Sequence, residues 1–166
     1  MAKLLTLEDL FLHELADLHD AEQRLTKALP EMEKNAISTT LKQALRSHLT
    51  ETETHVTRLE QIFGMFGQKA KGETCEGIKG LIEEGQDLLD EDAQDPVHDA
   101  GLIASAQKVE HYEIAGYGTL RTWAVLLGRK EAAQLLEFTL DEEKLADQKL
   151  TEIARLLNLR AAGVRA

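Results

Sequence analysis

The residues in this sequence that could carry out chemistry are carboxylates and imidazoles at positions where helices normally bury apolar side chains. Stepping three or four residues at a time along each of four long helical segments traces a core stripe. Every stripe is apolar near both ends and carries acidic or imidazole side chains near its middle. These central residues are Glu22, His48, Glu51, His55, Glu110, Glu113, Glu143 and Asp147. Because four helices break the apolar pattern in the same way, we interpret the interruptions as parts of one polar centre.

The spacing of the acidic residues along the chain places them at one level of a bundle. Glu22 and Glu51 lie at nearly equal distances on either side of the first expected turn, and Glu113 and Glu143 do so around the second. Equal distances from the turn of an antiparallel helical hairpin mean equal heights along its axis. The two hairpins also match each other in the order and spacing of these residues. We therefore predict a repeated helical hairpin that folds onto itself.

Burial of this many carboxylates requires compensating charge. An unpaired buried charge costs several kcal/mol even after relaxation, whereas a whole domain is stable by only about 5–15 kcal/mol. No Lys or Arg lies in the middle of the stripes, whereas two divalent cations would offset most of the charge. Oxygen-rich ligands with one or two imidazoles suit iron or manganese. The predicted ligands of two such ions per chain are Glu22, Glu51, His55, Glu110, Glu113, Glu143 and Asp147, with His48 either a further ligand or a hydrogen-bonded core histidine.

Other imidazole and aromatic side chains are left outside this ligand set. Tyr112 and Tyr117 are interpreted as packing residues, either of which could bring a hydroxyl near the metal. His13, His19 and His98 have no partner in the pattern, and we expect them at the surface.

Four long helices and a crossover must position these residues. Caps, breakers and apolar periodicity predict helices over about 6–35, 38–64, 96–127 and 129–158, with a shorter helix at about 75–91. Pro30 is expected to kink the first helix or end it early, because its ring removes a backbone hydrogen bond. The predicted fold class is all-α, a four-helix bundle with a short helix in the long crossover between the second and third long helices. We expect a single domain over 1–166, with a first helical hairpin 6–64, a crossover 65–95, a second helical hairpin 96–158 and a short C-terminal tail 159–166.

Charge and composition limit the partners and the compartment. The chain has 166 residues and a formal net charge of −11, which argues against a nucleic-acid or anionic-membrane partner. No apolar run approaches the roughly 20 residues of a membrane span, and the first residues lack the apolar region of a signal peptide. Cys75 is the only cysteine, so no internal disulfide forms. These features predict a cytoplasmic protein.

Four stretches carry a resemblance to a known family: LADLHDAEQRL (15–25), HLTETETHVTRLE (48–60), AQKVEHYEIAGYGTL (106–120) and TLDEEKLADQKL (139–150). The layout is similar to the ferritin-like di-iron and di-manganese carboxylate bundles. More closely, the chain resembles the YciF/YciE family of bacterial stress-associated ferritin-like proteins over about residues 6–157. The resemblance implies a dimeric ferritin-like four-helix bundle with a dinuclear site, without implying a settled activity.

The sequence departs from the general ferritin-like pattern in two places. Glu51 and His55 are four residues apart rather than three, and Asp147 stands where a histidine is usual. Either spacing keeps a pair on one helical face. A ligand set with few histidines changes the geometry and potential of a metal, so the kinetics of a ferroxidase do not carry over.

Two functional hypotheses follow. The first is a dinuclear iron or manganese carboxylate protein that reacts with dioxygen or peroxide in a stress response, which would be an oxidase- or peroxidase-type enzyme. The second is a non-enzymatic dimeric stress or binding module, in which the inner carboxylate site is structural or vestigial. Turnover with ferrous iron and an oxidant distinguishes the first from the second.

Overall fold

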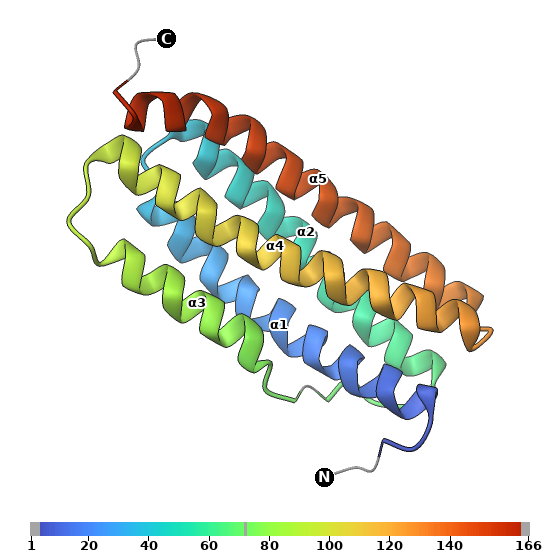
Figure 1. Ribbon diagram of the computed structural model, residues 1–166. Coiled ribbons are helices and arrows are strands. Elements are labelled where there is room, and N and C mark those ends of the chain that lie inside the picture. Colours follow the sequence, from blue (N-terminus) through green and yellow to red (C-terminus); the bar gives the residue numbers. More distant parts are fainter. Residues whose placement is uncertain (1–3, 72, 164–166) are drawn as a thin grey trace.

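The computed structural model describes residues 4–71 and 73–163, and these residues form helices joined by short connections (Figure 1). No strand occurs among the described residues, which confirms the all-α prediction. The helices are α1 (Leu7–Asn35), α2 (Thr39–Met65), α3 (Glu76–Leu89), α4 (Asp95–Leu126) and α5 (Lys130–Ala161).

The four long helices, α1, α2, α4 and α5, form the bundle, and α3 lies outside it against α4 and α1 (Figure 1). The two antiparallel hairpins, α1–α2 and α4–α5, contain the most extensive contacts between elements. The short helix α3 is the one predicted at about 75–91 in the crossover. The predicted architecture is therefore confirmed.

Local sequence signals fix the ends of the hairpins. Thr6 and Asp9 form a capping box at the start of α1, in which each side chain accepts a hydrogen bond from the backbone N–H of the other. Gly128, with φ of +72°, turns the chain between α4 and α5 in the left-handed region that favours glycine. The buried Asp99 carboxylate accepts hydrogen bonds from the backbone N–H groups of Ile37 at 2.8 Å and Ser38 at 2.6 Å. This contact ties the turn of the first hairpin to the second hairpin.

Helix α1 ends where the sequence predicts, whereas α5 ends later than predicted. Pro30 lies inside α1, which continues to Asn35, so the alternative of an early end at the proline does not occur. Pro30 lies on the exposed face of α1, where water can reach the backbone carbonyl left without a donor. Helix α5 runs to Ala161 rather than to residue 158, and the chain turns only at Gly163, with φ of +70°.

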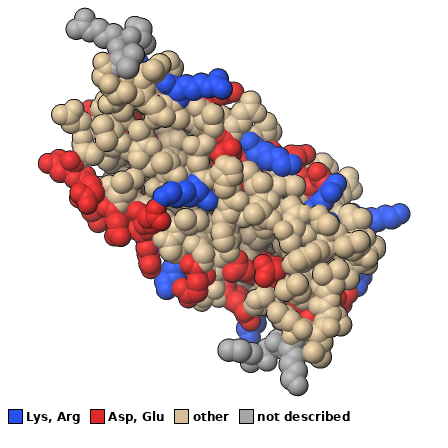
Figure 2. Space-filling model, in the orientation of Figure 1, with Lys and Arg blue, Asp and Glu red and all other residues tan. Residues whose placement is uncertain are grey.

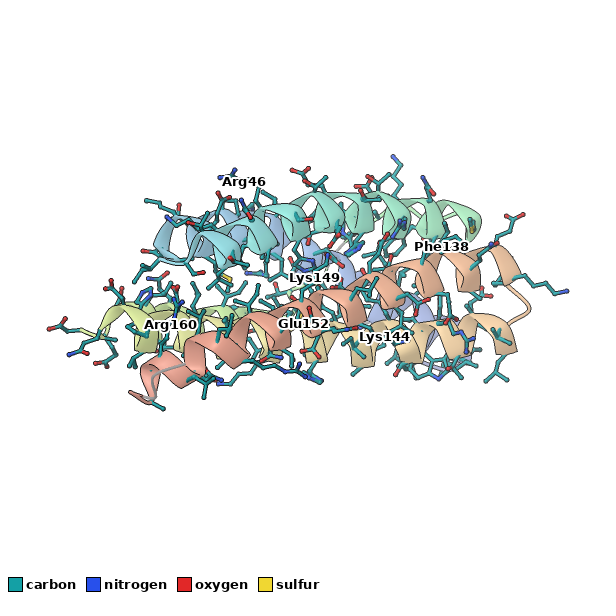
Figure 3. The ribbon with its side chains drawn as sticks, turned by 90° about the horizontal axis from the view of Figure 1, so that it is seen from above. Arg46, Phe138, Lys144, Lys149, Glu152 and Arg160 are labelled. Carbon is teal, nitrogen blue, oxygen red and sulfur yellow. The ribbon has the colours of Figure 1, made fainter. Side chains whose placement is uncertain are left out.

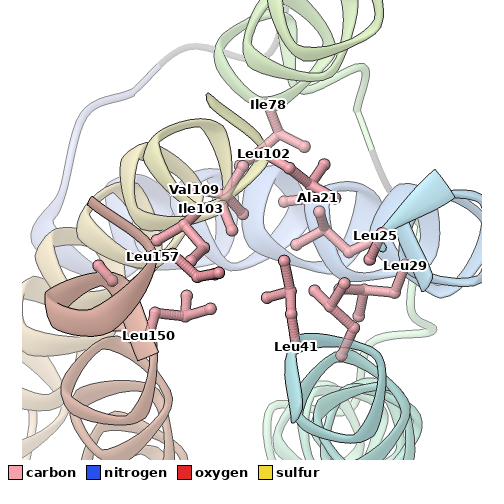
Figure 4. Close-up of a cluster of buried hydrophobic side chains, with 14 of the residues drawn as sticks. Ala21, Leu25, Leu29, Leu41, Ile78, Leu102, Ile103, Val109, Leu150 and Leu157 are labelled. Atoms are coloured by element: carbon pink, nitrogen blue, oxygen red, sulfur yellow. The ribbon is translucent and has the colours of Figure 1, made fainter. Parts of the chain in front are cut away.

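Two clusters of buried apolar side chains fill the bundle at opposite ends. The first includes Leu25, Leu41, Leu102 and Leu157 and is drawn in Figure 4, where Ile78 of α3 adds to it from outside the bundle. The second is built around residues such as Phe11, Ile62, Leu120 and Leu136. Burial of each such large side chain stabilises the fold by about 1.5–3 kcal/mol. Because these two layers supply the packing, the level between them can hold polar groups.

The surface carries the excess of acidic charge unevenly. Acidic side chains gather over the outer side of α3 and the connection that follows it (Figure 2). They include the exposed residues Glu83, Glu84, Asp87, Asp90, Glu91 and Asp92. Within the described part of the chain, no helix combines the length and apolar character needed to cross a membrane.

Candidate metal centre

Six titratable side chains from the four bundle helices meet between the two apolar clusters. They are Glu22 of α1, His48 and His55 of α2, Glu110 and Glu113 of α4, and Glu143 of α5. All six are buried, and Glu22, Glu113 and Glu143 have no exposed surface. Such a concentration of carboxylates away from water needs protons or cations to balance it.

The six side chains form two groups that share one carboxylate. We call His48, Glu110, Glu113 and Glu143 the His48 group, and Glu22, His55 and Glu143 the His55 group. Within each group, one donor atom from every residue lies within 4.8 Å of the others. Glu143 Oε2 is 3.6 Å from His48 Nε2, and Glu143 Oε1 is 2.9 Å from His55 Nδ1. The two oxygens of Glu143 thus face different groups.

His55 is held from behind by a carboxylate and a guanidinium. Its Nε2 lies 3.0 Å from Glu142 Oε2. Arg58 pairs with both oxygens of Glu142, with Nη2 donating to Oε1 at 3.1 Å, and also donates from Nη1 to Thr139 Oγ1 at 3.1 Å. A carboxylate that accepts one ring N–H of a histidine fixes the orientation and tautomer of the ring. The other nitrogen, Nδ1, is therefore directed into the centre.

The inner nitrogen of His55 faces two carboxylates. Its Nδ1 lies 3.2 Å from Glu22 Oε1 and 2.9 Å from Glu143 Oε1, without the alignment of a hydrogen bond. The buried hydroxyl of Tyr117 donates to Glu22 Oε1. Tyr117 packs in the apolar core and also places its hydroxyl at the centre, as the sequence allowed.

His48 contacts acidic groups through both ring nitrogens. Its Nε2 lies 3.3 Å from Glu110 Oε1, and its Nδ1 lies 3.3 Å from Glu51 Oε2. Glu51 is partly exposed, and its Oε1 lies 3.7 Å from Lys149 Nζ. The neighbour of Glu51, Thr52, takes the inward position on α2 and is fully buried.

Many oxygens of the centre have no hydrogen-bond partner among the described residues. They are Glu22 Oε2, Thr52 Oγ1, Glu110 Oε2, both side-chain oxygens of Glu113 and both of Glu143. A buried polar atom left without a partner costs about 1–3 kcal/mol. Carboxylate oxygens that converge in pairs and lack donors are the arrangement that divalent cations satisfy, so the residues present fit a metal.

The pKa values show how the centre balances its charge without a metal. Burial raises the pKa of Glu113 well above its usual value, and the neighbouring carboxylates raise it further. Burial and the Glu143 carboxylate raise the pKa of Glu110 despite His48 nearby. Burial opposes the charged form of the histidines, but the carboxylates raise the pKa of His48 to about 9 and that of His55 to about 11. These shifts favour the protonated forms, which lower the negative charge of the centre.

The structure brings most of the predicted ligands together. Glu22, His55, Glu110, Glu113 and Glu143 lie in the centre, and His48 joins them. Glu51 lies at the edge, where it contacts His48. Asp147 lies outside both groups and accepts a hydrogen bond from Gln107 Nε2 at 2.9 Å, with His111 Nε2 at 3.5 Å. Their roles as ligands stay predictions.

Sequence reasoning missed the residues behind His55 and misplaced one histidine. Arg58 follows His55 by one helical turn and Glu142 precedes Glu143, so their spacing contained a signal that the core stripes did not use. The expectation of His19 at the surface is wrong. His19 is 3% exposed and packs edge-on against Phe63, with ring centroids 6.0 Å apart.

The sequence pattern of a domain of unknown function, DUF892, matches residues 6–162. The chain belongs to the DUF892 family. It is 45% identical over 150 residues to protein YciF of Escherichia coli K12, a match that covers 90% of each chain. The resemblance to the YciF family is thereby confirmed.

Solved structures of the DUF892 family member YciF and of similar proteins show the same fold. The structure of the E. coli stress protein YciF matches with a TM-score of 0.90 at 44% identity, covering 93% of this chain and 98% of that one. YcfI of Rhodopseudomonas palustris, described as a candidate structural protein, matches with a TM-score of 0.88 at 48% identity, covering 90% and 95%. A protein of Xanthomonas campestris with 19% identity shares the fold alone, with a TM-score of 0.72, covering 93% and 94%. The chain is a ferritin-like four-helix bundle.

Proposed function

We propose that this protein is a dinuclear metal carboxylate protein that binds two iron or manganese ions and reacts with dioxygen or peroxide. The observation that carries the proposal is Glu143, whose two oxygens face two separate groups of buried ligands. One ion would be held by the His48 group and the other by the His55 group. The stress-protein description of E. coli YciF supports a role in a stress response.

The charge of the centre supports two divalent ions. The two groups together contain four carboxylates and two imidazoles. With the carboxylates ionised and the imidazoles neutral, two divalent cations balance the charge. An oxygen-rich set with two nitrogens and no thiolate favours iron or manganese over zinc or copper.

Bound iron or manganese would supply a redox-active Lewis acid able to bind a small oxidant. The chain's own residues prepare the place for it. Glu142 accepts the Nε2 hydrogen of His55 and keeps its Nδ1 inward, while the Tyr117 hydroxyl holds one oxygen of Glu22. The apolar clusters above and below exclude water from the carboxylates.

The two remaining predicted ligands have roles at the edge of the centre. Glu51 contacts the outer nitrogen of His48, and Asp147 lies one turn beyond Glu143 on α5. Asp147 accepts a hydrogen bond from Gln107 and lies near His111, outside both groups. The homodimer implied by the family resemblance remains a prediction.

A second function is a non-enzymatic module in which the same centre is structural or vestigial. The observation that favours it is the complete burial of Glu22, Glu113 and Glu143, which leaves little room for a substrate beyond a small oxidant. The description of YcfI as a candidate structural protein points the same way. Consumption of dioxygen or peroxide by the iron-loaded protein separates the two functions.

Metal analysis by mass spectrometry tests the proposal. Protein purified without an affinity tag or chelator is loaded with ferrous iron and washed, and we expect about two ions per chain. Glu113→Gln should lower the occupancy strongly, because both oxygens of Glu113 lie in the His48 group without partners. Glu91→Gln, on the exposed surface, is the matched control and should leave it unchanged. Equal occupancy in the two variants would contradict the site.

A further inference from the structure

One cavity of the described molecule is lined by ligands of the centre and leads outward. It lies between α2 and α5 and includes His48, Glu51, Glu110 and Lys149 in its lining. Its volume is about 10 Å³, which is at the lower limit for one water molecule. A cation could pass here only if side chains moved aside.

Four charged or titratable side chains connect this cavity to solvent in single contacts. Lys149 Nζ lies 3.7 Å from Glu51 Oε1, and Glu51 Oε2 lies 3.3 Å from His48 Nδ1. His48 Nε2 then lies 3.3 Å from Glu110 Oε1. The exposed fraction of the side chain falls from 50% at Lys149 to 28% at Glu51 and 8% at His48. An unbroken series of contacts between charged or titratable side chains thus leads from the surface to the buried carboxylates.

We propose that this chain of side chains is the route by which a divalent cation reaches the centre, an inference that rests on the proposed function. Glu51 is the first carboxylate that the cation contacts. Lys149 is paired with Glu51 until the cation displaces it. Figure 3 shows Lys149 on the side of α5 that faces α2. His48 has one nitrogen toward Glu51 and the other toward Glu110, so it is the next residue that the cation contacts on its way to the buried carboxylates.

The opposite side of the centre supports this direction. There the gap between α2 and α5 is closed by Arg58, which pairs with both oxygens of Glu142 and bonds Thr139. A guanidinium repels an approaching cation and cannot lose its proton. The pair at the other side is a single Lys149–Glu51 contact of 3.7 Å, which a divalent cation can replace more easily.

Loading kinetics test the route. Metal-free protein is mixed with cobalt(II) under stopped flow, and the visible absorption of bound cobalt gives both the rate and the final amount. We expect Glu51→Gln to slow loading about tenfold and Lys149→Gln to accelerate it several-fold, with the difference shrinking at high salt. The final amount of cobalt should match the wild type in both variants.

Matched controls come from the same two helices. Lys144 is also 50% exposed on α5, and its contact with Asp141 at 3.2 Å is away from the cavity, so Lys144→Gln should load at the wild-type rate. Glu53→Gln, on the exposed face of α2, should do the same. Thermal unfolding of each variant confirms that the fold is retained.

The outcomes separate the route from the proposed function. Normal cobalt binding with unchanged rates in Glu51→Gln and Lys149→Gln would overturn the route alone. Loss of one cobalt at equilibrium in Glu51→Gln would make Glu51 a ligand and also overturn its role as the first stop. No cobalt bound by the wild type would overturn the proposed function and the route together.

Discussion

The two histidines of the centre lie seven residues apart on α2. Each has a glutamate at its outer nitrogen and a basic residue beyond that glutamate, but the basic residue holds the glutamate more firmly beside His55 than beside His48. The outer nitrogen of His55 meets Glu142, which Arg58 holds through both oxygens. The outer nitrogen of His48 meets Glu51, whose basic partner Lys149 makes a single longer contact. If ions bind as proposed, the firmly supported His55 would hold an ion and the less supported His48 would admit one, so the same side-chain type would serve two purposes.

The carboxylates on the two sides of the centre also differ. Glu22 on the His55 side receives a hydrogen bond from Tyr117, whereas Glu113 on the His48 side has no partner at either oxygen. Burial and neighbouring carboxylates raise the pKa of both, but His55 and the Tyr117 hydroxyl oppose this rise at Glu22. We therefore expect the His48 side to gain more stability from a bound cation than the His55 side.

The largest effect should come from the residue that joins the two sides. Glu143→Gln removes an anionic oxygen from both groups at once, so we expect the metal content to fall from about two ions per chain to less than one. Metal analysis after loading and dialysis measures it. Glu152→Gln, exposed on the same helix, is the control. Retention of one fully occupied ion would show that Glu143 serves a single group.

Metal removal should be the next largest effect. A ligand at a hundred times its dissociation constant stabilises the folded state by about 2.7 kcal/mol, which corresponds to roughly 5–10 °C in Tm for a chain of this size. We expect chelation to lower Tm by this amount in the wild type and by much less in Glu113→Gln. Calorimetry on loaded and metal-free protein measures it. An unchanged Tm after verified metal loss would refute the link between metal and stability.

A smaller effect, limited to one of the two ions, should follow when the support of His55 by Glu142 is removed. Glu142→Gln replaces a carboxylate acceptor with an amide, so we expect about 10–100-fold weaker binding of one ion while the other is unaffected. Isothermal titration of metal-free protein resolves the two affinities. The control is Glu137→Gln, on the same helix as Glu142, which breaks an exposed ion pair with Arg121 of α4. It should change neither affinity. An equal loss of affinity for both ions would contradict the distinction between the two sides.

The sequence predicted the bundle and its polar level because both follow from helical periodicity. Distances from the turns put Glu22, Glu113 and Glu143 at one height, and the structure buries all three together. The edge residues were harder to predict. Along a helix, residues four apart differ by about 40° in direction and residues seven apart by about 20°. His48 therefore follows His55 inward more closely than Glu51 does.

The spacing of the supporting residues along their own helices contained a signal, but single-helix patterns could not show that these side chains meet. Arg58 and Glu142 are 84 positions apart, and their contact depends on how α2 and α5 rotate against each other. Thr52, by contrast, follows from the helical pattern, because it lies on the core stripe between His48 and His55, and it is fully buried. For His19, the absence of a partner in the pattern suggested the surface, but contact with Phe63 buries it.

The most direct test of a two-ion centre joined by Glu143 is an anomalous-scattering map from crystals of the protein loaded with manganese. We expect two peaks inside each chain, one beside His48 and one beside His55, with the Glu143 carboxylate between them. A single peak that contacts both histidines, or no peak among these residues, would contradict the two-ion centre.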